Sequence, residues 1–231
     1  MRAIKILGLE TSTTNCSVAL SINGRTEVIK EENSKNYSHA EKLNVFIDEV
    51  LKQSKLKVND LDAVAVSKGP GSYTGLRIGV SSAKGLCFAC NLPLISIPTL
   101  ESLAHQIPTE RLSQGDLILP MLDARRMEVY TQTYKSNLTA ISKTEAKVLE
   151  EDSFEDLEAT HLHFIGNGVE KFKKISNLKN VHFYTQEIPS ANEMGKIAFK
   201  KFQNNEFEDV AYFEPFYLKD FIAGKPKKRF Q

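Results

Sequence analysis

The first thirty residues alternate between apolar and polar side chains, a pattern of period two that predicts short β-strands. We expect strands at residues 4–9, 16–22 and 25–30. Asn23 and Gly24 stand between the last two strands, and both residue types tolerate the positive φ that a two-residue hairpin turn requires. The chain is therefore expected to open as an antiparallel meander.

A helical period replaces this alternation in segment 39–54, which we predict to be the first helix. Ser38 precedes the segment and Glu41 follows three residues later, so the two have the form of a capping box. The apolar residues at helical spacing are Leu43, Phe46, Ile47, Val50 and Leu51.

Strands and helices then alternate, which predicts an α/β fold in which helices cover a mixed sheet. The expected elements are a strand at 61–66, a helix at 74–90, a strand at 93–97 and a helix over 99–106. The polar segment that follows contains Pro and Gly, and is the best candidate for a linker.

The opening pattern returns after this linker, which indicates a second lobe related to the first. The strand expected at 117–123 ends on Asp123, as the first strand leads into Glu10, and a further strand is expected at 127–134. An amphipathic helix is predicted at 190–204, where Ser190 and Glu193 have the form of a second capping box. The predicted division is an N-terminal lobe at 1–106, a linker at 107–116, a C-terminal lobe at 117–221 and a basic tail at 222–231.

Composition narrows the classes of function. The 231 residues include 30 Lys and Arg against 29 Asp and Glu, so the overall charge does not attract the chain to nucleic acid or to a membrane. Three cysteines are typical of a reducing compartment, and the C-x-x-C of Cys87 and Cys90 lies in a predicted helix, where core packing is favoured over redox or metal chemistry. No apolar run is long enough to span a bilayer, and the N-terminus reads as a strand rather than a signal peptide. A cytoplasmic protein is expected.

The stretch SKGPGSYTGLRIGVSSAKGL at residues 67–86 has glycines that suit either a phosphate or a neighbouring backbone. A P-loop does not fit, because Gly69 and Gly75 are one residue too far apart and Leu76 and Arg77 stand where Lys and Ser/Thr are needed. The dinucleotide fingerprint does not fit either, since the spacing is G-x-G-x-x-x-G.

Close packing suits the same stretch better. Gly75, Gly79, Ala83 and Cys87 recur at every fourth position, which gives the predicted helix one face almost without side chains. A glycine inside a helix costs about 0.5–1 kcal/mol relative to alanine, and close approach of another backbone offsets that cost. The period leaves open whether the neighbour is the chain's own sheet or another subunit.

Glu10 and Asp123 are the one carboxylate pair that suits catalysis, since acids at equivalent strand ends of two lobes would face one cleft. Such acids hold magnesium in nucleases and orient metal and water in actin-like ATPases. A metal-dependent ATPase or phosphotransferase and a nuclease therefore remain as alternatives. The histidines show no metal-binding spacing, and His161 and His163 share a strand face that favours an exposed edge.

Five segments, in this order, resemble one protein family. They are ILGLETSTTNCSVAL at 6–20, the glycine-rich stretch at 67–86, PLISIPTLESLA at 93–104, LDARRMEVY at 122–130 and EPFYLKD at 214–220. The chain resembles the TsaB (YeaZ) family, the non-catalytic partner in bacterial tRNA threonylcarbamoyladenosine synthesis. Residues 135–185 are the least well matched part.

The resemblance implies two tandem actin-like (ASKHA, RNase H-like) lobes with mixed sheets covered by helices. The catalytic relative, TsaD, attaches a threonylcarbamoyl group to adenosine 37 of ANN-decoding tRNAs with a metal held by a helical histidine pair. The helix expected at 99–106 offers only His105, so the pair is missing. The resemblance thus implies an inactive paralogue with no catalytic residue, no metal and no required cofactor, in which Glu10 and Asp123 line a vestigial cleft between the lobes.

The resemblance also implies partners. The first two helices are expected to form a homodimer in isolation or a heterodimer with TsaD, to which the ATPase TsaE is added, while tRNA is an indirect partner and no membrane is involved. The side-chain-poor face of the second helix is then expected at a subunit boundary. Whether a nucleotide binds weakly at the shared interface, and whether the basic tail contacts tRNA, stay open. The implied interface residues are Tyr37, His39, Leu43, Phe46, Gly75, Arg77, Gly79 and Lys84.

Overall fold

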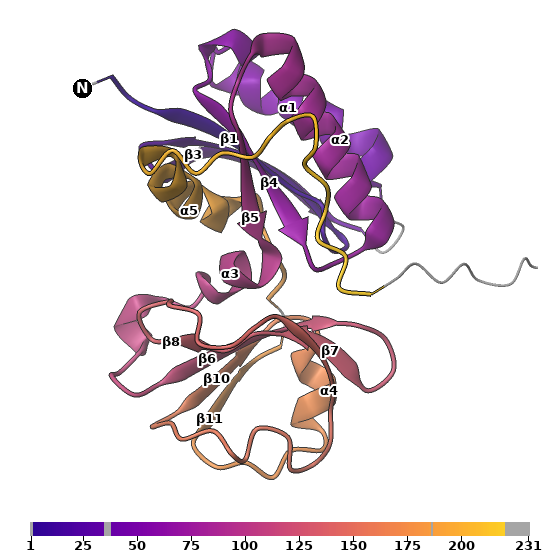
Figure 1. Cartoon of the computed structure of the whole chain (residues 1–231), viewed down its shortest axis with the longest axis vertical. Helices are drawn as coiled ribbons and strands as arrows, with labels where there is room; N and C mark the ends of the chain where they lie inside the picture. The colour runs from indigo at the N-terminus through magenta and orange to yellow at the C-terminus, as the bar shows by residue number, and fades with distance from the viewer. Residues whose placement is uncertain (1, 35–37, 186, 220–231) are drawn as a thin grey trace, which may run out of the picture.

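Two lobes stacked along the long axis make up the molecule, each built on its own sheet (Figure 1). The computed structural model describes residues 2–34, 38–185 and 187–219. Within these residues, no helix is both long and apolar enough to cross a membrane. The mixed sheets and their covering helices confirm the predicted α/β class.

The first sheet has five strands in the order β3-β2-β1-β4-β5. They are β1 (Lys5–Glu10), β2 (Asn15–Ile22), β3 (Arg25–Asn33), β4 (Ala63–Gly69) and β5 (Leu94–Pro98). The first three strands are antiparallel neighbours, as predicted, while β1, β4 and β5 run parallel. Asn23 and Gly24 have φ values of 50° and 82°, which confirms the hairpin turn between β2 and β3.

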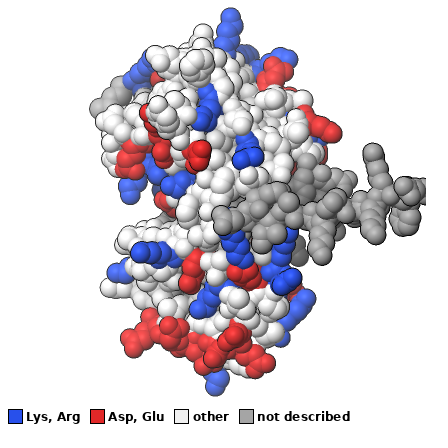
Figure 2. Space-filling model, turned by 45° about the vertical axis from the view of Figure 1, so that its right-hand side comes forward, with Lys and Arg blue, Asp and Glu red and all other residues white. Residues whose placement is uncertain are grey.

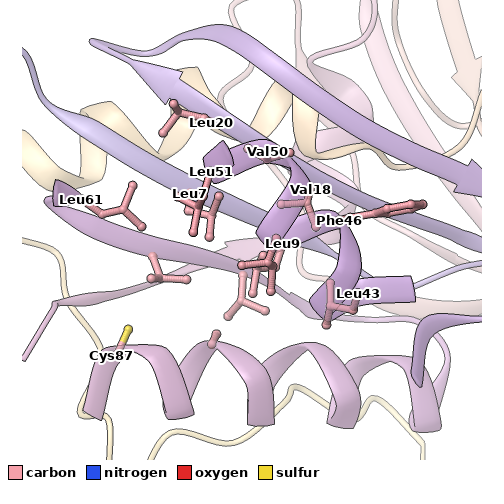
Figure 3. Packing of buried hydrophobic residues seen from close by; sticks show 14 of the residues in the cluster. Leu7, Leu9, Val18, Leu20, Leu43, Phe46, Val50, Leu51, Leu61 and Cys87 are labelled. Carbon is pink, nitrogen blue, oxygen red and sulfur yellow. The ribbon is translucent and has the colours of Figure 1, made fainter. Parts of the chain in front are cut away.

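Helices cover both faces of this sheet. They are α1 (His39–Gln53) and α2 (Tyr73–Cys90) on one face and α5 (Ala191–Gln203) on the other (Figure 1). The alternation of β1 produces the two layers, because Leu7 and Leu9 join the cluster under α1 and α2 whereas Ile6 joins the cluster under α5. Figure 3 shows the first of these clusters, to which α1 contributes Leu43 and Phe46.

The second sheet repeats the topology of the first. Its order is β11-β10-β6-β7-β9, with β6 parallel to β10 and antiparallel to β7, so that β6, β7, β9, β10 and β11 correspond to β1 to β5. The strands are β6 (Leu117–Asp123), β7 (Glu128–Thr131), β8 (Tyr134–Lys135), β9 (Glu145–Val148), β10 (Leu162–Ile165) and β11 (Val181–Tyr184). The short helices are α3 (Thr99–Ala104), α4 (Val169–Lys173) and the 3₁₀ turns Val58–Asp60 and Thr109–Arg111.

The path of the chain after β11 differs from the predicted domain boundaries. The prediction places α5 in a second lobe at 117–221, but Ala191, Met194 and Ile197 of α5 pack against the first sheet. Residues 206–219, which we call the C-terminal strap, then run beside α2 (Figure 1). An amphipathic pattern shows that a helix has an apolar face but does not show which sheet that face covers. The predicted tail at 222–231 lies outside the described residues.

The two predicted capping boxes do not form as expected. The side chain of Ser38 makes no cap hydrogen bond at the start of α1 and donates instead to Glu32 at 3.3 Å. Ser190 does cap α5, because its hydroxyl accepts the N–H of Asn192 at 3.2 Å. The carboxylate of Glu193 bonds to other side chains rather than back to the cap.

Candidate protein-interaction surface

The side-chain-poor face of α2 packs inside this chain, against the turn that follows β1. A Cβ atom at Gly75 would lie 2.1 Å from the carbonyl oxygen of Thr11, and one at Gly79 would lie 2.3 Å from the Thr11 hydroxyl oxygen. That hydroxyl donates to the carbonyl of Gly75 at 2.8 Å. The neighbour is therefore the chain's own backbone, and the expectation of a subunit boundary along this face is wrong.

The same face ends in the C-x-x-C pair, which confirms the packing interpretation of the cysteines. Cys87 is buried under α2 and Cys90 is partly exposed, and neither forms a disulfide. Burial raises the pKa of the Cys87 thiol to about 12. A thiol in this state is a poor nucleophile and a poor metal ligand.

The implied interface residues of α1 also lie in the first lobe's interior. Leu43 and Phe46 belong to the core under α1. His39 is buried, with its Nε2 atom 2.7 Å from the carbonyl oxygen of Thr13, and burial lowers the pKa of its imidazole. Tyr37 lies outside the described residues. These side chains hold α1 on the sheet, so any contact with a partner falls to their outward-facing neighbours.

Arg77 and Lys84 are the implied interface residues that do reach the surface of α2, and both hold the C-terminal strap. Nζ of Lys84 donates to the carbonyls of Ala211 and Phe213 at 3.0 and 2.9 Å. Nε of Arg77 donates to the hydroxyl of Tyr217 at 3.3 Å. The strap therefore covers one side of α2 and leaves the outer side free.

The uncovered side of α2 carries an exposed aromatic residue. Phe88 is 86% exposed, and Tyr212 of the strap is 84% exposed. Lys84 binds the backbone on both sides of Tyr212 and lies one helical turn before Phe88, so both rings belong to one region. Sequence analysis missed Phe88, although it stands one position beyond the buried stripe that ends at Cys87. The exposed positions of α2, which we call the α2 surface, are Thr74, Arg77, Ser81, Gly85, Phe88 and Ala89.

Glu10, at the end of β1, is fully enclosed. Its Oε1 atom accepts the N–H of Ser12 at 2.6 Å and the hydroxyl of Ser67 at 2.9 Å, while Oε2 has no hydrogen-bond partner among the described residues. Burial raises the pKa of Glu10 above 4.5, against the opposing effect of these hydrogen bonds. Such a carboxyl favours its neutral form, whereas a metal needs the ionised form.

Asp123, at the equivalent end of β6, is in a different setting. Its side chain is 47% exposed, and its Oδ1 atom lies 3.2 Å from Nζ of Lys171 and accepts the N–H of Arg125 at 2.6 Å. Glu10 and Asp123 share no bonding partner in the described part of the chain, and the single cleft that we expected them to line stays a prediction. The described residues contain no group of three or more His, Cys, Asp or Glu side chains arranged to hold a metal ion.

A polar cavity of about 600 Å³ lies elsewhere, between β3 and the start of α5. The carboxylate of Glu31 lines it and accepts hydrogen bonds from Asn15, Ser17 and Ser190, so its charge is satisfied within the fold. Burial raises the pKa of Glu193 at the same wall. No sequence motif indicated this cavity, because its walls come from segments far apart in the chain.

His163 of the second lobe is buried, which corrects the prediction of an exposed edge for this residue, whereas the side chain of His161, just before β10, is 42% exposed. β10 lies between β6 and β11, and the carboxylate oxygens of Asp116 lie 3.2 Å from Nδ1 of His161 and 3.2 Å from Nε2 of His163. The ring of His182 stacks on His163 with centroids 4.7 Å apart. Burial lowers the pKa of His163, so this histidine fits a neutral structural role.

Comparison with known proteins gives one consistent result. Residues 28–227 match the family model described as TsaD: tRNA N6-adenosine threonylcarbamoyltransferase. The tRNA threonylcarbamoyladenosine biosynthesis protein TsaB of Haemophilus influenzae is 29% identical over 235 residues, which cover 97% of this chain and 98% of the relative. TsaB of Buchnera aphidicola subsp. Schizaphis graminum is 32% identical over 216 residues, with 90% and 98% covered.

The solved structures agree with these sequences. The structure of YeaZ from Pseudomonas aeruginosa superposes with a TM-score of 0.81 at 25% identity, and covers 93% of this chain and 100% of that one. The similarity extends across both lobes, including residues 135–185, which the sequence motifs matched least well.

Proposed function

Because the chain belongs to the TsaB (YeaZ) family, we propose that it serves, without catalysis of its own, as the partner that TsaD requires to form threonylcarbamoyladenosine at adenosine 37 of ANN-decoding tRNAs. The heterodimer would form through the outer faces of α1 and α2. The work of this chain is then to bind and position the transferase, in the cytoplasm where tRNA is modified.

One observation carries the proposal: the α2 surface presents Phe88 with 86% of its area exposed. An aromatic ring kept in water stabilises nothing in the free chain, whereas aromatic anchors dominate the energy of many interfaces. Val45 on α1 is also 48% exposed, so both helices offer apolar contact area. The small residues Gly85 and Ala89 lie beside Phe88 on the α2 surface, so the ring projects from it, and the polar Ser81 lies two turns before Phe88.

The settings of the two acids support the absence of catalysis. Glu10 is buried and its pKa is raised, so ionising it to hold magnesium would cost free energy. Asp123 already pairs with Lys171, which competes with any cation for the same oxygen. No cofactor is then required by this chain, and any nucleotide bound at the shared interface would depend on groups that TsaD supplies.

The test is a heterodimer measurement with purified TsaD. Phe88→Ser is expected to weaken association by at least about tenfold, because a central aromatic anchor is worth roughly 2 kcal/mol or more. Ile141→Ser is the matched control, since Ile141 is 48% exposed on the second lobe. Threonylcarbamoylation by TsaD should also need this chain. Appreciable product without it, or equal binding by both variants, would contradict the proposal.

One observation favours the runner-up, a metal-dependent ATPase or phosphotransferase. Oε2 of Glu10 is a buried oxygen without a partner in the described residues, and such unsatisfied groups often mark functional sites. Magnesium-dependent ATP turnover by the isolated chain, lost in Glu10→Gln, would establish that alternative. RNA cleavage lost in the same variant would point to a nuclease.

Assembly with other partners follows from the same surface. A homodimer and the TsaD heterodimer that both use α1 and α2 must compete, so adding TsaD should dissolve the homodimer. The ATPase TsaE would then join the heterodimer rather than the isolated chain. Mass in solution, measured with each component added in turn, distinguishes these orders; a stable homodimer that persists in excess TsaD would contradict the shared surface.

A further inference from the structure

The loop between β6 and β7 holds two consecutive arginines in an unfavourable backbone conformation. Arg125 has a φ of 71° and Arg126 has a φ of 47°. Glycine and asparagine adopt this left-handed region readily, whereas a long side chain does so at a cost. Strain of this kind persists where the surrounding structure enforces it, and it is concentrated at functional sites.

The surrounding structure does enforce it. The carboxylate of Asp123 accepts the N–H of Arg125 at 2.6 Å. Nζ of Lys171, from α4, donates to the carbonyls of Arg126 and Glu128 at 2.8 and 2.7 Å. The acid at the end of β6 and the lysine of α4 thus fix the loop, and the loop presents both guanidinium groups to solvent.

The charges of this region do not cancel. Asp123 is paired with Lys171, and Glu128 is paired with Lys219 of the C-terminal strap. Arg125 and Arg126 are exposed and form no ion pair within the described residues. Asp123 and Glu128 are therefore already neutralised, and the two arginines add exposed positive charge to the loop.

The described end of the strap lies at the same place. Its last described residue, Lys219, binds Glu128 beside the loop, with its Nζ 5.9 Å from the ring centroid of Tyr130. Figure 2 shows Lys and Arg on the part of the second lobe that is nearer the first lobe, and Asp and Glu gathered toward the far end of that lobe.

The acidic segment 150–158 limits the direction from which an anionic chain can approach the arginine loop. The N–H of Leu149 donates to the carbonyl of Met127 in the loop, and the acidic segment 150–158 leads away from that point. An anionic chain can therefore approach Arg125 and Arg126 from the strap side but not from the side of residues 150–158.

We propose that Arg125 and Arg126, in the loop beside the described end of the strap, form a docking surface for the phosphate backbone of tRNA. Guanidinium groups suit phosphate oxygens, and phosphate contacts position a nucleic acid without reading its sequence. The choice of tRNA rests on the proposed function, which supplies an RNA substrate. The surface is separate from the α2 surface, so one chain would bind the transferase through its first lobe and the RNA through its second.

The test measures binding of a fluorescently labelled, unmodified tRNA transcript to the full chain, alone and in complex with TsaD, over a series of salt concentrations. Arg125→Asn with Arg126→Gly removes both charges and inserts residues that favour positive φ. Affinity should fall on the order of tenfold at low salt, and the slope of log K against log salt should flatten by about 1 for each arginine. The melting temperature should rise by about 2–4 °C as strain is relieved.

The matched control removes two charges from the first lobe. Lys55 also has a positive φ, of 54°, so Lys55→Asn with Lys57→Ser repeats both the charge loss and the relief of strain at a distant place. It should leave tRNA affinity unchanged. Equal losses in both variants, or no loss in either, would overturn the proposal, as would an absence of tRNA binding both alone and with TsaD.

Two further readings keep the outcomes distinct. Heterodimer formation, measured by mass, should be unchanged in the arginine variant. If TsaD does not bind the wild-type chain at all, the proposed function fails. The tRNA measurement on the isolated chain still tests the arginine surface in that case. Loss of binding to phosphatidylglycerol vesicles with tRNA binding intact would assign the surface to a membrane and overturn the RNA assignment.

Discussion

Replacing the glycines of α2 one at a time by alanine tests whether the helix needs them to pack on the turn after β1. Gly75 and Gly79 face Thr11, whereas a Cβ atom at Gly85 would meet no atom within 4 Å. Each change adds the same methyl group to the same helix. Differences in stability between the three variants therefore report their surroundings.

The structure gives the expected order. Gly85→Ala should raise the free energy of unfolding by about 0.5–1 kcal/mol, the gain in helix propensity. Gly75→Ala should lower it by about 1–3 kcal/mol, because the new atom would lie 2.1 Å from the backbone carbonyl of Thr11 and overpacking outweighs that gain. Gly79→Ala should fall between them, since it meets a hydroxyl that can rotate at the cost of one hydrogen bond, about 1 kcal/mol.

Far-UV circular dichroism suits the measurement, since the chain has no tryptophan. One kcal/mol moves the melting temperature of a chain of this size by about 2–4 °C, so Gly75→Ala and Gly85→Ala should shift it in opposite directions. Equal increases in all three variants would refute the reasoning, because they would mean that α2 stands away from Thr11. If Gly75→Ala abolished the heterodimer without lowering stability, the side-chain-poor face of α2 would lie at a subunit boundary after all.

Two further predictions concern the buried acid and the strap. Glu10→Gln should match wild-type stability below pH 4.5 and exceed it at pH 8. Burial raises the pKa of Glu10 in the folded chain, so the neutral carboxyl contributes stability below the pKa of the unfolded chain, and that stability is lost as the pH rises through the pKa of the folded chain. Urea unfolding at both pH values measures this, and an equal difference at each would contradict it. Lys84→Ala removes two hydrogen bonds to the strap and should speed amide exchange in residues 206–219. Unchanged exchange there, with Lys57→Ala as the exposed control, would show that other contacts hold the strap.

The sequence predicted the elements of the first sheet well, because alternation and helical period are local properties, but it did not predict β9 and β11 of the second sheet. Asn23 and Gly24 identified the first hairpin, and the acids at the ends of β1 and β6 identified the internal repeat. The two sheets share one strand order. In the sequence, only the equivalent acids at the ends of β1 and β6 indicated that shared order.

The neighbours of each face were not predictable in the same way. The stripe of Gly75 and Gly79 showed that something approaches α2 closely, but only the structure identifies Thr11 as the contact. The pattern of α5 likewise showed an apolar face without showing that the chain returns to the first sheet. Phe88 was overlooked because a lone apolar residue beside a buried stripe reads as core until the exposed area is known.

The glycines of α2 also account for the state of Glu10. Because they let the start of α2 lie on the turn after β1, the N–H of Ser72 reaches the carbonyl of Ser12 at 2.6 Å, and the carboxyl beneath that turn is closed off from water. The second lobe begins its helix in a similar way, yet α4 ends after five residues where α2 continues for eighteen.

The shorter helix leaves Asp123 open and brings Lys171 of α4 onto it. Equivalent acids in the two lobes thus have different surroundings. In the first lobe α2 packs closely and encloses Glu10. In the second lobe the shorter α4 leaves Asp123 exposed, and Asp123 supports the arginine loop. Each outcome uses the strand end to shape the fold or its surface. This physical link between glycine spacing, helix length and acid environment supports the proposal that the chain works by binding rather than by turnover.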